Sequence, residues 1–321
     1  MAALPSLRQL SYLAALAERL NFTQAAQDCF VTQSTLSAGI MELESILNAR
    51  LVERERHRVV LTPLGMAVTE RARALLAAAA DLVESTQGAA APLAGVVRLG
   101  VIPTIAPFLL PQVLPEMRVQ YPALQFALRE DLTANLLARL DSGQLDLALI
   151  ALPYDVGNLL VRELFMEELW LVTPPGEKTP RRLEIAALDT ERLLLLEEGH
   201  CLRGHTLTGC GLTPKPTHGY EATSLYTLVQ MIEEGMGVGL LPEMTLQAGL
   251  LRHSPLIARP FAAPAPRRGI ALVARPSTSR REVFDRLGDE IVARHKQNQA
   301  SKLLSPSRRG RVKPSGKQRA T

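Results

Sequence analysis

The feature that most constrains the fold of this chain is a change in its hydrophobic pattern near residue 95. Before that point, apolar residues recur at three- and four-residue steps, which is the spacing of amphipathic helices. After it, short apolar runs alternate with helical stretches, which is typical of a sheet connected by helices. Because 321 residues also exceed one ordinary domain of about 150 residues, we expect at least two domains.

Composition narrows the class of protein further. Hydrophobic residues make up 47% of the chain, so a large core is available, and the 21% of charged residues excludes global disorder. No apolar run reaches the roughly 18 residues of a membrane span, and no signal-peptide cleavage site follows the N-terminal helix. Three cysteines do not suffice for a secreted disulfide scaffold. We therefore expect a cytoplasmic protein with no membrane association.

The net charge of +4 is unevenly distributed. Residues 299–321 contain seven lysines and arginines and no acid, among Ser, Pro and Gly. This composition predicts a disordered basic tail. A solvated appendage is the favoured interpretation, and an arm that binds polyanions without specificity is the alternative.

Three helices and a wing are predicted in the first 62 residues. The apolar spacing from Leu4 to Leu20 predicts one helix, and a second, short helix should run from Thr23 to about Phe30. Thr32 is an N-cap candidate for a third helix that ends near Leu47, and residues 50–62 resemble a two-stranded wing. The buried stripe of the third helix is predicted to consist of Leu36, Ile40, Leu43 and Leu47.

This arrangement predicts a winged helix-turn-helix, whose third helix enters the major groove of DNA. Hydroxyl and amide side chains at the start of that helix suit base edges, and wing arginines suit phosphates. A surface helix with solvated polar residues is an equally good reading of the pattern alone. The candidate DNA-binding residues are Thr23, Gln24, Thr32, Gln33, Ser34, Thr35, Ser37, Arg54, Arg56 and Arg58.

Four segments carry a resemblance to a known family. FTQAA at residues 22–26, VTQSTLS at 31–37, LVER at 51–54 and LTPLG at 61–65 resemble the DNA-binding module of LysR-type transcriptional regulators. Ser34 stands where the family often has Pro, and Asn48 stands where Gly usually ends the recognition helix; Asn is the next-best left-handed cap. The resemblance implies a double-stranded DNA operator and RNA polymerase as partners.

A long Ala- and Leu-rich helix is predicted from Pro63 to about Gly88. Its many small residues allow close helix–helix approach, so it should pair with its symmetry mate. The resemblance implies the same role, because this is the linker helix through which LysR-type regulators dimerise, and it further implies a tetramer. Residues 88–92 are the expected hinge into the next domain.

From residue 95 onward the predicted elements indicate a parallel α/β sheet in two lobes with a cleft between them. The chain should cross between lobes near residues 160–167 and again near 260–268. The resemblance implies a regulatory domain built like a periplasmic solute-binding protein. The expected strands cover residues 96–102, 124–129, 145–151, 168–172, 193–196, 237–241 and 270–274, and the expected helices cover 107–120, 134–140, 224–234 and 279–296.

The predicted fold is thus α/β with an N-terminal winged helix-turn-helix and a two-lobed, periplasmic-binding-protein-like regulatory domain. The predicted domains are residues 1–62 for DNA binding, 63–90 for dimerisation, 91–298 for sensing and 299–321 for the tail.

A candidate chemical site lies where strands end at the cleft, because ligands of open α/β sheets bind there. Cys201 stands at or just before a helix start, between His200 and Arg203. The helix dipole and these cations should lower the pKa of its thiol. Cys210 follows after a polar segment that looks deformable, residues 202–209, so the two thiols could meet after local rearrangement.

Spacing alone favours two unrelated thiols over a redox pair. GHCLR at residues 199–203 with Cys210, together with residues 102–104 and 266–268, is however similar to the OxyR-type, peroxide-sensing members of the LysR family. That resemblance implies that Cys201 is the peroxidatic thiol and Cys210 the resolving thiol, re-reduced by a cytosolic thiol reductant. The residues implied to bind hydrogen peroxide are Thr104, Thr133, His200, His218 and Arg268.

The leading hypothesis is therefore a transcriptional activator of antioxidant genes, switched by a reversible Cys201–Cys210 disulfide. The alternative is a LysR-type regulator that binds a small organic effector in the inter-lobe cleft. A thiol peroxidase enzyme would leave residues 1–90 without a role, and a secreted solute-binding protein conflicts with the missing signal peptide. No metal or other cofactor is expected, and Cys29 is expected to be a core residue.

Overall fold

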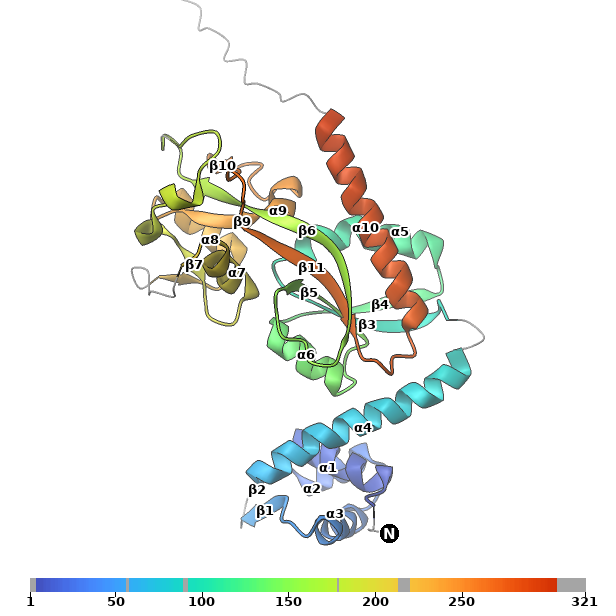
Figure 1. The fold of residues 1–321 in the computed structure, drawn as a ribbon. Helices are drawn as coiled ribbons and strands as arrows, with labels where there is room; N and C mark the ends of the chain where they lie inside the picture. The colour runs from blue at the N-terminus through green and yellow to red at the C-terminus, as the bar shows by residue number, and fades with distance from the viewer. Residues whose placement is uncertain (1–3, 56–57, 89–91, 178, 213–219, 305–321) are drawn as a thin grey trace, which may run out of the picture.

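The computed structural model describes residues 4–304 except 56–57, 89–91, 178 and 213–219. The N-terminal region consists of α1 (Leu7–Arg19), α2 (Phe22–Asp28), α3 (Gln33–Leu47), β1 (Val52–Glu55) and β2 (Arg58–Leu61), and β1 and β2 pair antiparallel as the wing (Figure 1). These elements confirm the predicted winged helix-turn-helix.

Local capping explains why these helices begin and end where they do. Ser6 closes a capping box with Gln9 at the start of α1, and Asn21 accepts from two backbone N–H groups at the start of α2. Thr32 caps α3 as predicted, and Asn48 ends it in the left-handed conformation, φ 47°. The stripe of Leu36, Ile40 and Leu43 is fully buried. Leu47 was predicted to join it but is exposed, because the chain turns away at Asn48.

Helix α4 (Pro63–Gly88) has the predicted bounds and connects the two regions (Figure 1). Its Asp81 forms a buried bidentate ion pair with Arg275, whose Nη1 donates to the carbonyls of Leu140 and Leu145 at 2.7 Å each. Gly143 packs so closely on Ala77 that a Cβ atom there would clash. The linker helix is therefore fixed to the α/β region within one chain.

The α/β region is built on a seven-stranded mixed sheet with the order β10-β6-β11-β5-β3-β4, and β9 pairs with β6. Only β3–β4 and β3–β5 pair parallel in it, whereas β11 and β6 run antiparallel to their neighbours. The prediction of a parallel sheet was therefore wrong for four of its six strand pairings, because the chain returns through β11 from the second lobe. The strands are β3 (Gly95–Val101), β4 (Leu124–Glu130), β5 (Leu147–Leu152), β6 (Leu160–Thr173), β7 (Leu195–Leu196), β8 (Glu221–Ala222), β9 (Gly239–Pro242), β10 (Ile257–Arg259) and β11 (Arg267–Ala274).

The two lobes share their longest strands. The predicted crossing near residues 160–167 lies within β6, which runs from one lobe into the other (Figure 1). The predicted crossing near residues 260–268 is mostly irregular, and only its last two residues belong to β11. β6 pairs with β11 along its first part and with β9 and β10 along its last part. Helices cover both faces: α5 (Ala106–Gln120), α6 (Thr133–Asp141), α7 (Cys201–Gly209), α8 (Leu225–Glu233), α9 (Glu243–Gln247) and α10 (Arg281–Leu304), with two 3-10 turns, Ile185–Ala187 and Thr190–Arg192.

Two segments are more helical than the sequence indicated. Residues 202–209, which were expected to form a deformable polar segment, lie entirely within α7. Helix α10 continues to Leu304, so the first six residues of the predicted tail, 299–304, are helical; the remaining tail residues lie outside the described part of the chain.

Candidate functional site

Four of the predicted site residues converge between the lobes. Thr104 follows the carboxyl end of β3, Thr133 is the first residue of α6, Cys201 is the first residue of α7, and Arg268 lies near the start of β11. The side chains of Thr104, Thr133 and Arg268 are at most 2% exposed. The first lobe thus contributes the two hydroxyls and the second lobe the thiol, with the guanidinium on the strand between them.

Three hydrogen bonds to Thr104 and Glu167 fix the Arg268 guanidinium. Its Nη1 donates to the Thr104 hydroxyl at 2.8 Å and its Nη2 to the Thr104 carbonyl at 3.2 Å. Its Nε donates to Oε2 of Glu167 at 2.9 Å, in a salt bridge of which both partners are buried. A buried guanidinium with three fixed contacts is a preorganised positive charge.

The Cys201 thiol is partly buried, and burial raises its pKa above the ordinary value. Arg268, the Thr133 hydroxyl and backbone N–H groups at the helix start act in the opposite direction. The prediction of a lowered pKa was therefore wrong for this reduced form, because desolvation outweighs the groups that favour the thiolate. The stabilising groups themselves are those that a reactive cysteine requires.

Thr133 is a notable partner because its buried Oγ1 makes no hydrogen bond to any other group in the described part of the chain. A buried hydroxyl is costly to leave without a strong hydrogen-bond partner, and a thiol is only a weak one. Next to a thiol, it is available to a small molecule that both donates and accepts hydrogen bonds. Hydrogen peroxide has both capacities.

His200 and Arg203 flank the thiol in sequence but play different parts. His200 is the buried N-cap residue of α7; burial lowers the pKa of its imidazole, and Glu197, 3.7 Å from its Nε2, acts in the opposite direction. Arg203 points toward β7 and β8, where its Nη1 donates to the Leu196 carbonyl and to Glu221 at 2.7 Å. The prediction that Arg203 lowers the pKa of Cys201 was therefore wrong, because the ion pair with Glu221 holds its guanidinium away from the thiol. His218 lies outside the described residues.

Sequence reasoning missed two residues of the site, Glu167 and His205. Glu167 had no distinct signal, because its strand β6 also contains Arg162, Glu163 and Glu168. The signal for His205 was its position one helical turn after Cys201, on the same face of α7. His205 Nε2 donates to the Pro153 carbonyl at 3.2 Å, while the buried Nδ1 has no hydrogen-bond partner among the residues that the structure describes. Burial lowers the pKa of its imidazole to about 4, so the ring is neutral.

Cys210 is the C-cap residue of α7 and is buried, and its burial raises the pKa of the thiol to about 11. Cys210 follows Cys201 by nine positions, which in a helix is a rise of about 13 Å along the axis, whereas a disulfide needs Cα atoms within about 7 Å. All three cysteines are free. The helix must therefore unwind before Cys201 and Cys210 can pair.

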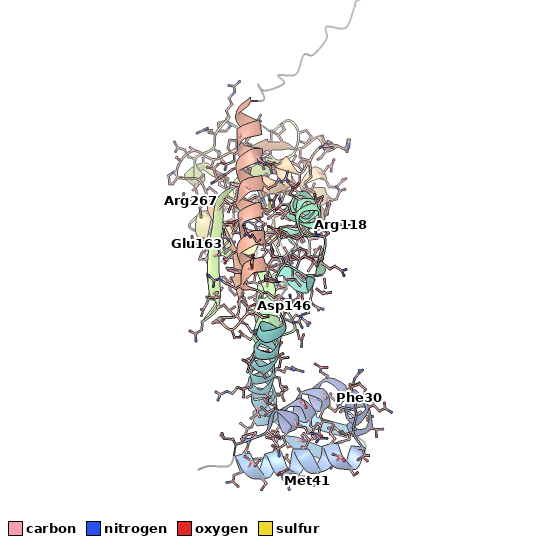
Figure 2. All side chains as sticks on the ribbon, turned by 90° about the vertical axis from the view of Figure 1, so that its right-hand side faces the viewer. Phe30, Met41, Arg118, Asp146, Glu163 and Arg267 are labelled. Carbon is pink, nitrogen blue, oxygen red and sulfur yellow. The ribbon has the colours of Figure 1, made fainter. Side chains whose placement is uncertain are left out.

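The start of α3 forms a polar surface. Thr23, Gln24, Thr32, Gln33, Ser34 and Thr35 are exposed, and Ser37 is half-buried. The Thr32 hydroxyl lies 2.9 Å from that of Ser34 and 2.8 Å from that of Thr35, which orders the cluster. Figure 2 shows Met41 of the same helix pointing away from the rest of the molecule, at its far end from the α/β region.

The wing is anchored to this helix. Oε1 of Glu44 in α3 accepts from the backbone N–H groups of Leu51 and Val52, at 2.7 and 3.1 Å. Arg54 lies in β1 and Arg58 in β2, so the wing carries both beside α3; Arg56 lies outside the described residues. The described candidates for DNA contact thus share one end of the molecule.

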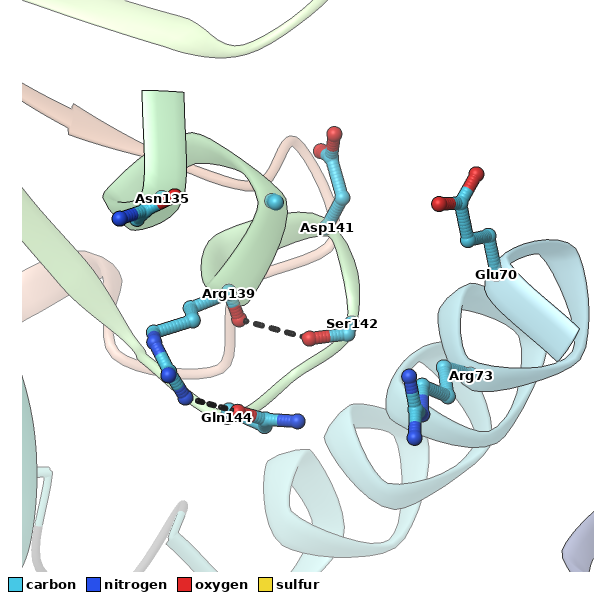
Figure 3. A pocket seen from close by; sticks show the side chains of 8 residues that line it. Glu70, Arg73, Asn135, Arg139, Asp141, Ser142 and Gln144 are labelled. Atoms are coloured by element: carbon cyan, nitrogen blue, oxygen red, sulfur yellow. Dashed lines mark hydrogen bonds between the residues drawn. The ribbon is translucent and has the colours of Figure 1, made fainter. Parts of the chain in front are cut away.

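A pocket separate from the thiols lies between α4 and α6 (Figure 3). Arg139 donates there to Gln144 at 2.5 Å, and Glu70 and Arg73 face it from α4. None of the predicted site residues lines it. The pocket follows the contact between the linker helix and the first lobe.

In the described part of the chain, the helices are too short or too polar to cross a membrane. Two protein families match the chain. The family described as bacterial regulatory helix-turn-helix protein, lysR family, matches residues 7–66, and the LysR substrate binding domain matches residues 90–296.

Three known proteins illustrate the similarity. The chain is 46% identical to the HTH-type transcriptional regulator EstR of Acinetobacter baylyi over 287 residues, covering 89% of this chain and 95% of EstR. It is 37% identical to the hydrogen peroxide-inducible genes activator of Dickeya chrysanthemi over 306 residues, 94% of this chain and 99% of that one. The solved structure of a full-length OxyR variant from Pseudomonas aeruginosa superposes with a TM-score of 0.75 at 32% identity, covering 90% and 95% of the two chains.

Proposed function

Because the chain belongs to the lysR family of bacterial regulatory helix-turn-helix proteins, we propose that it is a DNA-binding transcriptional regulator that senses hydrogen peroxide through Cys201 and Cys210. Relatives named as hydrogen peroxide-inducible activators and an OxyR structure support this function. The observation that carries it is the placement of Cys201 at a helix start, with Arg268 and the Thr133 hydroxyl as neighbours that favour its thiolate.

The proposed reaction has two steps. The Cys201 thiolate attacks one peroxide oxygen, the O–O bond breaks, and the leaving hydroxide takes a proton to become water, so that Cys201 becomes a sulfenic acid. Arg268 stabilises the thiolate and the charge that develops on the leaving oxygen, and Thr104 and Thr133 orient the peroxide. His200 and His218 complete the proposed pocket.

The Cys210 thiol then attacks the sulfenic sulfur, which forms the disulfide and releases a second water. Because α7 holds the two thiols at its opposite ends, this step requires the helix to unwind. Unwinding is the structural change through which oxidation would reach the DNA-binding region. A cytosolic thiol reductant would reverse it, in keeping with a cytoplasmic protein that makes one turnover per signal.

DNA binding is proposed to use the exposed polar residues at the start of α3 for base edges. Thr23 and Gln24 at the start of α2, and Arg54, Arg56 and Arg58 of the wing, would contact phosphates. RNA polymerase is the proposed partner of the activated complex. The basic residues after 304 are proposed to add only non-specific attraction to DNA.

Self-association is proposed to use two apolar surfaces. The linker helix α4 exposes Leu64, Met66 and Leu75, each by more than half of its side chain. A groove between α5 and β4 exposes Val119 by 74% and Leu128 by 51%. A monomer rarely exposes such patches, so we propose that a second copy covers both and that dimers pair into tetramers. Residues 1–62, 63–90, 91–298 and 299–321 would then be the DNA-binding domain, dimerisation helix, sensor and tail.

A direct test of this function is mass mapping of the thiols before and after stoichiometric hydrogen peroxide. A Cys201–Cys210 linkage that appears within seconds to minutes is expected. If Cys201 remains a thiol, the proposed function is wrong.

The alternative is a small organic effector in the inter-lobe cleft. It is favoured by the 46% identity to EstR, which is not named as a peroxide-inducible activator. Cys201→Ser distinguishes the two: a variant that still switches operator binding in response to peroxide would exclude the thiol mechanism.

A further inference from the structure

Glu167 is a buried carboxylate beside the redox site that the proposed reaction does not use. It lies on β6 directly across from Arg268 on β11, as a cross-strand pair, and it is 3% exposed. Its neighbour Glu168 pairs with Arg267 in the same register but is exposed on the other face of the sheet. Figure 2 likewise places Arg267 on the outside of the molecule.

Both oxygens of Glu167 are engaged. Oε2 accepts from Arg268 Nε at 2.9 Å, and Oε1 accepts from the backbone N–H of Met244 in the first turn of α9 at 2.7 Å. The carboxylate therefore holds one edge of the guanidinium, while Thr104 holds Nη1 and Nη2. Two residues thereby fix the position of Arg268 from opposite sides.

The carboxylate also changes the electrostatic effect of Arg268. A guanidinium favours the Cys201 thiolate by its positive charge, and a carboxylate on its other edge offsets part of that charge. Among the described residues, the charged groups that act on Glu167 are Arg268 and Glu243, and the charged side chain that acts on Cys201 is Arg268. An effect of Glu167 on the thiol must therefore pass through Arg268.

We propose that Glu167 is a positioning residue of the redox site, which fixes the Arg268 guanidinium and restrains the reactivity of the Cys201 thiol. This inference rests on the proposed function only in taking Cys201 as the reacting thiol. A purely structural Glu167 would pair a buried charge and cap α9 without influence on the thiol.

The experiment compares Glu167→Gln with the matched control Glu168→Gln in the reduced full-length protein. The rate of Cys201 alkylation by iodoacetamide is measured from pH 6 to pH 10, with the modified residue identified by mass mapping. We expect Glu167→Gln to lower the apparent pKa of Cys201 by about one unit, which is about tenfold faster alkylation at neutral pH. Glu168→Gln should match the unmodified protein. An unchanged or raised pKa in Glu167→Gln, or the same shift in Glu168→Gln, would overturn the proposal.

Two further variants test the route through Arg268. In an Arg268→Gln background, adding Glu167→Gln should no longer change the alkylation profile; a persisting shift contradicts the proposal. Glu167→Asp retains the negative charge but moves it away from Arg268, so this variant should fold even where Glu167→Gln does not. Its Cys201 should be alkylated about two- to threefold faster than that of the unmodified protein. Slower alkylation of Glu167→Asp would equally contradict it.

Alkylation requires no peroxide, so this inference and the proposed function can fail independently. Cys201 could show the shifted profile yet resist peroxide, which would refute only the sensor function. Alternatively, peroxide could oxidise Cys201 while iodoacetamide alkylates it at the same rate in all variants, which would refute only the role of Glu167.

Discussion

The two ends of helix α7 place the same functional group in two different environments. Cys201 opens the helix and Cys210 caps its end, and burial raises the pKa of both thiols. Within the described part of the chain, only Cys201 has neighbours that oppose this effect, namely Arg268, the Thr133 hydroxyl and backbone N–H groups. For Cys210, burial is the sole cause of the shift. Burial alone therefore does not distinguish the two thiols, whereas helix direction and the neighbouring cation do.

This asymmetry assigns the order of the chemistry. The helix N-terminus favours an anion and its C-terminus disfavours one, so the thiolate should form first at Cys201. Cys210 becomes useful as a nucleophile only after α7 has unwound and exposed it.

Exchanging one thiol at a time should have the largest effect. Cys201→Ser should abolish oxidation by peroxide, because a hydroxyl does not attack the O–O bond under these conditions. Cys210→Ser should leave the rate of Cys201 oxidation within about twofold but stop the reaction at sulfenic acid. Trapping with a sulfenic-acid reagent, followed by mass mapping, measures both outcomes.

Cys29→Ser is the matched control, since Cys29 packs against the core of the helix-turn-helix region far along the chain from α7. It should oxidise as the unmodified protein does. Equal loss of reactivity in Cys201→Ser and Cys210→Ser would show that the two ends are not functionally distinct.

Removing the cation should erase most of the advantage of Cys201. Arg268→Gln deprives the thiolate of its charged neighbour and leaves Glu167 buried without its ion-pair partner. We expect the peroxide rate constant to fall roughly 10- to 100-fold and the free energy of unfolding to fall by about 3–5 kcal/mol. Stopped-flow oxidation and urea denaturation measure the two effects.

Arg268→Lys separates charge from geometry. It retains the charge but cannot form the fork of contacts to Thr104 and Glu167. Its peroxide rate constant should therefore lie between those of Arg268→Gln and the unmodified protein. A rate for Arg268→Gln equal to that of the unmodified protein would mean that the guanidinium does not distinguish the two thiols.

The predictable part of the fold was that determined by local pattern. The caps at Thr32 and Asn48, the bounds of α4 and the wing follow from short-range chemistry, and the structure has them as predicted. The convergence of Thr104, Thr133, Cys201 and Arg268 followed from the family resemblance and the rule that ligands bind at strand ends. The roles proposed for these residues remain predictions.

What the sequence did not reveal depends on contacts between distant segments. The helical state of residues 202–209 arises although Gly204 and Gly209 weaken it, because α7 packs on β11; a Cβ at Gly209 would lie 2.9 Å from that of Pro266. Arg203 is turned away by Glu221, and Arg268 is matched by Glu167, 101 positions earlier. Such pairings have no local signature.

The two threonines of the site should respond differently to the loss of the hydroxyl. Thr133→Val removes a buried hydroxyl that makes no hydrogen bond to any other described group, so stability should be unchanged or rise by up to about 1 kcal/mol. Its peroxide rate constant should nevertheless fall several-fold, because the thiolate loses a donor. Thr104→Val deprives Arg268 Nη1 of its acceptor and should cost about 1–3 kcal/mol. A Thr133→Val protein of normal reactivity would exclude the hydroxyl from the site.

The smallest expected effect concerns the thiol at the end of α7 and appears only at alkaline pH. The folded protein holds the Cys210 proton up to about pH 11, whereas the thiol of the unfolded chain has a pKa of 9.0. Below pH 9 both states keep the proton and the full contribution to stability is present. As the pH rises from 9 to 11, the unfolded chain ionises first, so the free energy of unfolding should fall, by at most about 3 kcal/mol. Because other groups also titrate in this range, the measurement is the free energy of unfolding from urea denaturation at pH 9 and pH 11, compared between the unmodified protein and Cys210→Ala. The unmodified protein should lose more stability over this interval; parallel curves would mean that Cys210 ionises as freely as in the unfolded chain, and the contrast between the two ends of α7 would then rest on Cys201 alone.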